Sequence, residues 1–117
     1  MIRSSFKEKL FWVLGKRERY RVAGSSMYPT LRAGSDVLVD RFCGSLLEGD
    51  VVVCYHPLYR DLKLIKRVKK VYKNGSVHVF GDAYESDGSN FFGLVSRERI
   101  IGKVTSLFST PSNLDHT

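Results

Sequence analysis

The sequence has 117 residues, of which 43% are hydrophobic and 26% are charged, and its formal net charge at pH 7 is +7. These values fit one compact domain of ordinary globular composition and exclude an intrinsically disordered chain. No apolar run approaches the roughly 18 residues that a membrane-spanning helix needs.

The cysteines and histidines indicate neither a disulfide framework nor a metal site. Only Cys43 and Cys54 are present, and no signal peptide is recognisable near the N-terminus. The three histidines are far apart and lack the close spacing of zinc ligands: His56, His78 and His116. We therefore expect a soluble, cytoplasmic protein with reduced cysteines and no metal or other cofactor.

The N-terminal residues 4–15 have the pattern of an amphipathic helix. Ser5 and Glu8 have the spacing of a capping box. Four apolar residues then share one face at helical spacing: Phe6, Leu10, Phe11 and Leu14. The favoured interpretation is that this face packs on the domain. The alternative is contact with a membrane surface, because the opposite face is basic, and we do not expect this contact.

The rest of the chain is predicted to be β. Five runs are rich in β-branched and aromatic residues and are separated by turn signals: residues 35–40, 50–56, 62–72, 76–80 and 99–108. The stretch VVVCY lacks alternation, which is typical of a strand buried on both faces. Asn74 and Gly75 form the strongest hairpin signal. The predicted fold class is all-β, a small folded sheet or barrel with a short N-terminal helix.

This pattern divides the chain into three parts. Residues 1–20 form the amphipathic helix and a lead-in, residues 21–108 form the β domain, and residues 109–117 form a disordered tail. Several lysines and an arginine gather at residues 63–73. They are interpreted as a solvated surface, because no aromatic residue apart from Tyr72 interleaves them and no RNA-binding motif appears. We therefore expect no nucleic-acid partner.

The turn GSSMYPTL, residues 24–31, raises the question of a nucleophilic serine. A serine hydroxyl needs a base, but no G-x-S-x-G motif is present and no histidine has a suitable context. A lysine can replace the histidine if burial lowers its pKa. Lys66 fits, because strand alternation places it on one face with Leu64 and Val68. The alternative is an ordinary solvated lysine of an edge strand.

Four segments occur in the order found in type I signal peptidases: GSSMYPTL, EGDVVV, LIKRV and GDAYESDGSNFFGLV. The chain resembles that family from about residue 22 to residue 103. The short length and the closing stretch IIGKVTSL most resemble the nickel-type superoxide dismutase maturation proteases.

This resemblance implies a serine endopeptidase of the signal peptidase type that removes an N-terminal propeptide, with the nickel superoxide dismutase precursor as its protein partner. The alternatives are a membrane-associated type I signal peptidase-like enzyme and a non-catalytic basic β-barrel that binds nucleic acid.

The resemblance also implies roles for individual residues. Ser26, directly before Met27, corresponds to the nucleophile, and Lys66 corresponds to its general base. The backbone N–H of Ser26 corresponds to an oxyanion donor. Ser86 and Ser89 correspond to the serines of the last motif, and which of them orients Lys66 stays open.

The turn itself is implied to contact substrate. Its predicted substrate-binding residues are Gly24, Ser25, Met27 and Pro29. Gly24 stands where many signal peptidases carry a serine that supplies a second oxyanion donor, so this donor is absent here. In the last motif, Ala83 stands where the family has an asparagine.

Overall fold

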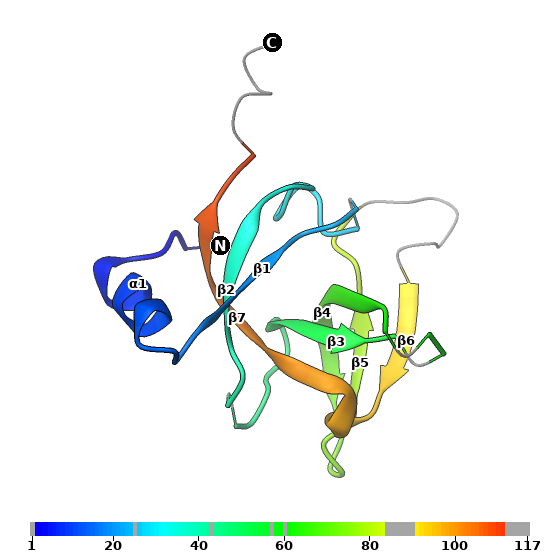
Figure 1. Ribbon diagram of the computed structural model, residues 1–117. Coiled ribbons are helices and arrows are strands. Elements are labelled where there is room, and N and C mark those ends of the chain that lie inside the picture. Colours follow the sequence, from blue (N-terminus) through cyan, green and yellow to red (C-terminus); the bar gives the residue numbers. More distant parts are fainter. Residues whose placement is uncertain are drawn as a thin grey trace.

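The computed structural model describes residues 2–24, 26–42, 44–56, 58–59, 61–83 and 91–111. These residues form one short α-helix and one sheet of seven antiparallel strands (Figure 1). The strand order is β1-β2-β7-β3-β4-β5-β6, so that β1 and β6 are the two edges of an open sheet. The predicted all-β fold with a short N-terminal helix is therefore confirmed, and the sheet is not a closed barrel.

The elements follow the chain in the order α1 Phe6–Val13, β1 Glu18–Arg21, β2 Asp36–Asp40, β3 Val51–Tyr55, β4 Lys63–Val71, β5 Val77–Phe80, β6 Phe91–Val95, η1 Arg97–Arg99 (a 3₁₀ helix) and β7 Ile100–Ser109. Five strands match the predicted runs within one or two residues. The prediction missed β1 and β6. Because β7 ends at Ser109, the predicted tail begins one residue too early, and residues 112–117 lie outside the described residues.

The strand β1 was missed because three of its four residues are charged, and a partner distant in sequence stabilises it. Arg19 and Arg21 both bind the buried carboxylate of Asp36 on β2, with Arg21 Nε 2.9 Å from Oδ1. The hydrogen bond from Arg21, followed by that from Arg19, lowers the pKa of Asp36 to about 2. The carboxylate therefore stays ionised and paired at neutral pH.

The strand β3 is buried on both faces, as its unbroken apolar run predicted. Val51 and Val53 point into one cluster of buried side chains, and Val52 and Cys54 point into another. The first core contains Val22, Met27, Leu31, Val37, Val39, Val51, Val53, Ile101 and Val104. The second core contains Leu46, Val52, Cys54, Val68, Val77, Val79, Val95 and Ile100. Two cores thus share one strand.

The predicted hairpin is also confirmed. It joins β4 to β5, with Gly75 at φ +90° and the amide of Ser76 donating to Asn74 Oδ1 over 3.0 Å. Most L-residues avoid this left-handed conformation, and glycine adopts it readily. The two strands are therefore placed side by side by a local signal.

The helix α1 begins as predicted but presents the opposite face to the sheet. Ser5 Oγ accepts a hydrogen bond from the Glu8 amide, which confirms the N-terminal cap. The expected packing face is wrong, because Phe6, Leu10 and Leu14 are exposed.

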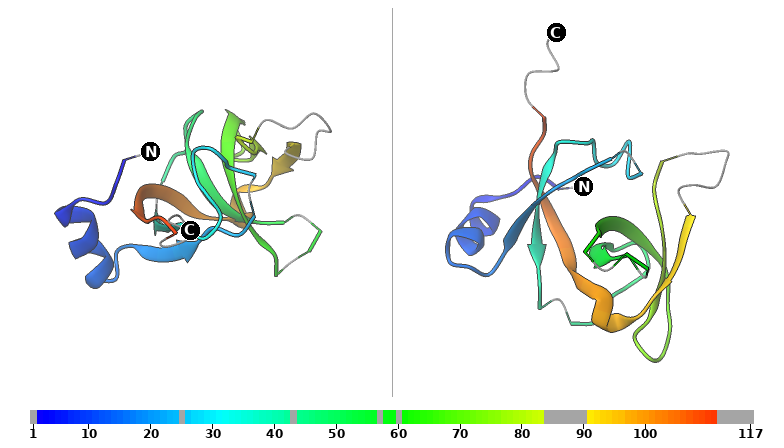
Figure 2. Two further views of the ribbon diagram at one scale, coloured as in Figure 1. Left: turned by 90° about the horizontal axis from the view of Figure 1, so that it is seen from above. Right: turned by 45° about the vertical axis from the view of Figure 1, so that its right-hand side comes forward.

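Residues on the other side of α1 attach it to β7. The carboxylate of Glu8 accepts hydrogen bonds from Thr105 and Ser106 and pairs with Arg17. The ring of Trp12 meets the ring of Phe108 edge-on, with centroids 4.7 Å apart. Both views of Figure 2 accordingly show α1 beside β7.

Candidate active site

The turn that carries Ser26 lies against the end of β5. The carbonyl oxygen of Ser26 accepts a hydrogen bond from the amide of Ala83 over 2.7 Å. The amide of Leu31 then donates to the carbonyl of Met27 over 2.8 Å, which closes one helical turn. In Figure 1 the light-blue segment after β1 meets the yellow-green end of β5. The backbone of Ser26 is thus held by its own turn and by the chain after β5, more than fifty residues later in the sequence.

The close approach of this turn depends on Gly81. A Cβ atom at residue 81 would lie 2.5 Å from the carbonyl oxygen of Ser26 and 3.1 Å from its Cβ. Both distances are too short for unstrained contacts. Glycine is therefore required here so that the backbone of the serine turn can rest on the end of the strand.

Lys66 lies on β4 and is buried, with only 6% of its surface exposed. It pairs with Val52 of β3, so its side chain shares the face that the second core covers. Burial disfavours the ammonium form and lowers the pKa of Lys66, and the neighbouring Cys54 would oppose this shift only as a thiolate. The predicted burial of Lys66 is confirmed. Lys70, on the same strand near the hairpin, is exposed as expected.

The thiol of Cys54 is itself buried in the second core and free. Burial raises the pKa of Cys54 to about 12. The thiol is therefore protonated at neutral pH and adds no negative charge that would keep Lys66 protonated. Cys43 lies outside the described residues.

The serine turn and the lysine strand both adjoin the end of β5. Phe80, the last residue of β5, pairs with Arg67 of β4, and the serine turn contacts the next residue, Gly81. Lys66 directly precedes Arg67 on β4. The dyad of Ser26 and Lys66 stays a prediction.

A bridge of three polar side chains joins the same elements. Arg67 donates two hydrogen bonds to Asp82, each 2.7 Å long, and Asp82 accepts a third from Thr30 in the serine turn over 2.6 Å. The guanidinium also donates to the carbonyl of Gly49. The bonds from Arg67 and Thr30 outweigh the effect of burial and lower the pKa of Asp82. Asp82 therefore ties β4 to the serine turn.

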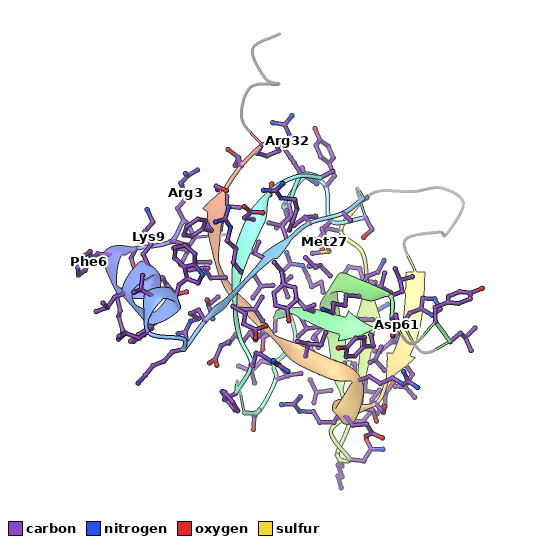
Figure 3. All side chains as sticks on the ribbon, in the orientation of Figure 1. Arg3, Phe6, Lys9, Met27, Arg32 and Asp61 are labelled. Atoms are coloured by element: carbon purple, nitrogen blue, oxygen red, sulfur yellow. The ribbon has the colours of Figure 1, made fainter. Side chains whose placement is uncertain are left out.

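The predicted substrate contacts of the turn differ in exposure. Gly24 and Pro29 are exposed, and a contact with substrate stays a prediction for both. Met27, labelled in Figure 3, is 1% exposed and belongs to the first core. Its side chain therefore anchors the turn to the first core, and a contact with substrate stays a prediction. Ser25 lies outside the described residues.

Two further predicted residues cannot be placed. Ser86 and Ser89, the predicted partners of the lysine, fall within residues 84–90, outside the described residues. Their roles stay predictions. Gly81 and Thr30, by contrast, were given no role by sequence reasoning. A glycine directly after a strand is a known signal of close backbone approach, but no local pattern connects Thr30 with Asp82.

The side chain of His56 holds the loop that follows β3. His56 Nδ1 accepts hydrogen bonds from the amides of Leu58 and Tyr59, and its ring lies against that of Tyr59. Within the described ranges, no group of three histidine, cysteine, aspartate or glutamate residues could hold a metal ion. None of the helices in those ranges has the length and apolarity needed to cross a membrane.

A hollow of about 360 Å³ lies at the far end of β5 from Ser26. Residues 44–46, the hairpin at 71–75 and Arg97 line it. Ser26 contacts the residues that follow Phe80, at the C-terminal end of β5, whereas this hollow lies at the N-terminal end of the same strand. The hollow is therefore separate from the candidate active site. An extended peptide needs a strand edge and not a deep cavity.

Comparison with known protein families identifies the family of this chain. Residues 10–71, just over half of the chain, match the family model described as signal peptidase, peptidase S26. The chain therefore belongs to the signal peptidase family, and the class of protein is a serine peptidase that acts on protein substrates. The matched segment includes both Ser26 and Lys66. A search of curated proteins found no significant match.

Proposed function

We propose that Ser26 and Lys66 form the catalytic dyad of a serine endopeptidase. The observation that carries the proposal is the burial of Lys66 next to Arg67, whose strand partner Phe80 directly precedes Gly81, on which the turn of Ser26 rests. Neighbouring strands lie about 5 Å apart. The long lysine side chain can extend across that interval toward the serine.

The chemistry follows from the two groups. Neutral Lys66 Nζ removes the proton from Ser26 Oγ while Oγ attacks the carbonyl carbon of the scissile peptide. The backbone N–H of Ser26 donates a hydrogen bond to the resulting oxyanion. The Lys66 ammonium then protonates the leaving amine, and an acyl-enzyme ester remains. Water, with Lys66 again as base, hydrolyses that ester and restores both residues.

Burial is what makes this lysine a usable base. A lysine in water has a pKa near 10.4 and is almost wholly protonated at pH 7. Desolvation lowers the pKa of Lys66, so a larger fraction is neutral at a given pH. The cleavage rate should therefore rise with pH and level off below the pH at which a solvated lysine would titrate.

The proposed reaction is removal of an N-terminal propeptide from the nickel superoxide dismutase precursor in the cytoplasm. The support is the resemblance of the four motifs and of the closing stretch IIGKVTSL to maturation proteases of that kind. The substrate would bind as an extended chain. The edge strand β1 ends shortly before Ser26 and offers free backbone groups for such pairing.

The test is cleavage of the purified precursor, with the new N-terminus read by mass spectrometry. Ser26→Ala and Lys66→Ala should each abolish cleavage while circular dichroism shows a folded sheet. The matched controls Ser45→Ala and Lys70→Ala change exposed residues of the same types and should retain activity. Cleavage that survives loss of Ser26 or Lys66 would exclude the dyad. Cleavage of a signal-peptide-bearing preprotein alone would instead assign a signal peptidase activity.

A further inference from the structure

The exposed face of α1 has the composition of a membrane-surface helix. Its apolar members are 83%, 42%, 74% and 60% exposed in the order Phe6, Leu10, Val13 and Leu14. At about 100° per residue, these four side chains occupy one sector of the helix surface. Lys7 and Lys9 lie at the two borders of that sector. Figure 3 shows Phe6 on the side of α1 remote from the sheet.

The fold holds this face outward. Glu8 and Trp12, on the opposite side of the helix, bind Thr105 and Phe108 of β7. The backbone of residues 2–4 also bonds to Leu107 of the same strand. These contacts attach α1 to β7. The apolar sector of the helix therefore cannot turn inward unless the contacts are broken.

The charge of this region is strongly positive. Residues 1–21 contain seven lysines and arginines and two glutamates, which gives a net +5 of the whole chain's +7. The basic residues are Arg3, Lys7, Lys9, Lys16, Arg17, Arg19 and Arg21. An apolar face inside a basic surround complements a membrane that carries anionic lipids.

We propose that α1 docks this protein onto an anionic lipid surface. The four apolar side chains enter the boundary between headgroups and acyl chains, and the two bordering lysines keep their ammonium groups among the lipid phosphates. Pairing with a second copy is disfavoured, because two strongly basic regions repel each other and a helix of eight residues is small for a stable interface. Sequence reasoning had favoured packing of this face, and its exposure reverses that preference.

Docking leaves the candidate active site accessible. In Figure 1 α1 lies beside β7, across the molecule from the end of β5 where the serine turn rests. Lipid binding therefore concerns residues that the proposed dyad does not use. Each proposal can fail without the other, since cleavage is measured on a precursor in solution and docking is measured without any substrate.

The test is flotation of the full chain with phosphatidylcholine vesicles that contain about one third phosphatidylglycerol, and with vesicles of phosphatidylcholine alone. We expect binding to the anionic vesicles that weakens in high salt. The double variant Phe6→Ser/Val13→Ser should reduce the binding constant on the order of tenfold or more. The matched control Phe42→Ser/Leu58→Ser removes residues that are 90% and 78% exposed elsewhere and should leave binding unchanged.

A second pair of variants tests the charge. Lys7→Gln/Lys9→Gln should weaken binding about fivefold per lysine, whereas Lys69→Gln/Lys73→Gln should have a smaller effect. The proposal is overturned if the native chain does not float with anionic vesicles, or if the α1 and control variants lose binding equally. It is also overturned if sedimentation without lipid shows a dimer that only the Phe6→Ser/Val13→Ser change dissociates.

Discussion

Lys66 combines a cost in stability with its proposed use in catalysis. The unfolded chain can hold this lysine as a hydrated ammonium, whereas the folded chain holds it against the second core with a lowered pKa. Between the folded and unfolded pKa values the unfolded state binds more protons, so this residue's contribution to stability rises with pH and its penalty disappears above about pH 10.4.

Lys66→Met should therefore stabilise the protein at neutral pH, because an apolar side chain of similar length replaces a desolvated base. The midpoint of urea unfolding should exceed that of the native chain at pH 7, and the difference should shrink toward pH 10. Proteolytic activity should be lost at every pH. A variant less stable than the native chain at pH 7 would contradict the assigned burial.

Gly81 is the second residue at which a small change should have a large effect. Gly81→Ala places a Cβ within 2.5 Å of the Ser26 carbonyl, so the serine turn must move away from β5. A displacement of this order misaligns a nucleophile, and we expect kcat/KM to fall by about tenfold to a hundredfold. The measurement is cleavage of the precursor at a temperature where the variant is folded.

A matched control is available for the steric cost. Gly102→Ala creates an equal overlap, 2.5 Å from the carbonyl of Asp40, at a site on β7. Both variants should lose about 1–3 kcal/mol of stability, but only Gly81→Ala should lose activity while folded. Equal losses of activity would show that Gly81 acts through stability alone.

Among the elements, the bridge from β4 to the serine turn should contribute more than any exposed ion pair. Arg67→Met removes the partner of Asp82, whose side chain is only 10% exposed, and leaves a carboxylate desolvated. The free energy of unfolding should fall by about 2–4 kcal/mol. The control Arg41→Met breaks the pair with Glu18, in which both side chains are about half exposed, and should change stability little.

The reason for the Arg67 effect can be tested by removing its partner as well. In Arg67→Met/Asp82→Leu no charge is left buried, so part of the lost stability should return. Chemical denaturation of the three variants measures both effects. A double variant less stable than Arg67→Met would show that the bridge acts by packing and not by charge.

Sequence patterns predicted those features that depend on nearby residues. Strand alternation around Leu64, Lys66 and Val68 predicted which lysine is buried. The turn residues Asn74 and Gly75 predicted the hairpin. The same local information identified the apolar face of α1. It could not tell whether this face or the opposite one packs against the sheet.

Contacts between distant segments decided the rest. The attachment of α1 depends on Glu8 meeting Thr105, almost a hundred residues later. Gly81 and Thr30 take part in the site only because the turn before β2 folds over the end of β5. No periodicity in the sequence records such contacts. The motifs therefore indicate the proposed dyad, but they do not indicate the residues that surround it.

For the whole molecule, the shared strand β3 makes the two cores one unit. Val52 belongs to the second core and Val53 to the first, and each is at most 1% exposed. Val52→Ala and Val53→Ala should each cost about 2 kcal/mol. Both should shift a single cooperative transition followed by circular dichroism and by tyrosine fluorescence. Two separate transitions in either variant would show that the cores fold independently.

The position of β7 has a consequence for the newly synthesised chain. It follows every other described strand in the chain, yet it lies between β2 and β3 and joins the strands on either side. A ribosome therefore releases the serine turn and the lysine strand well before β7. Until β7 is inserted, only the contacts of the serine turn with the end of β5 and the bridge from Arg67 through Asp82 to Thr30 join them. We therefore expect a nascent chain that still lacks β7 to show no proteolytic activity.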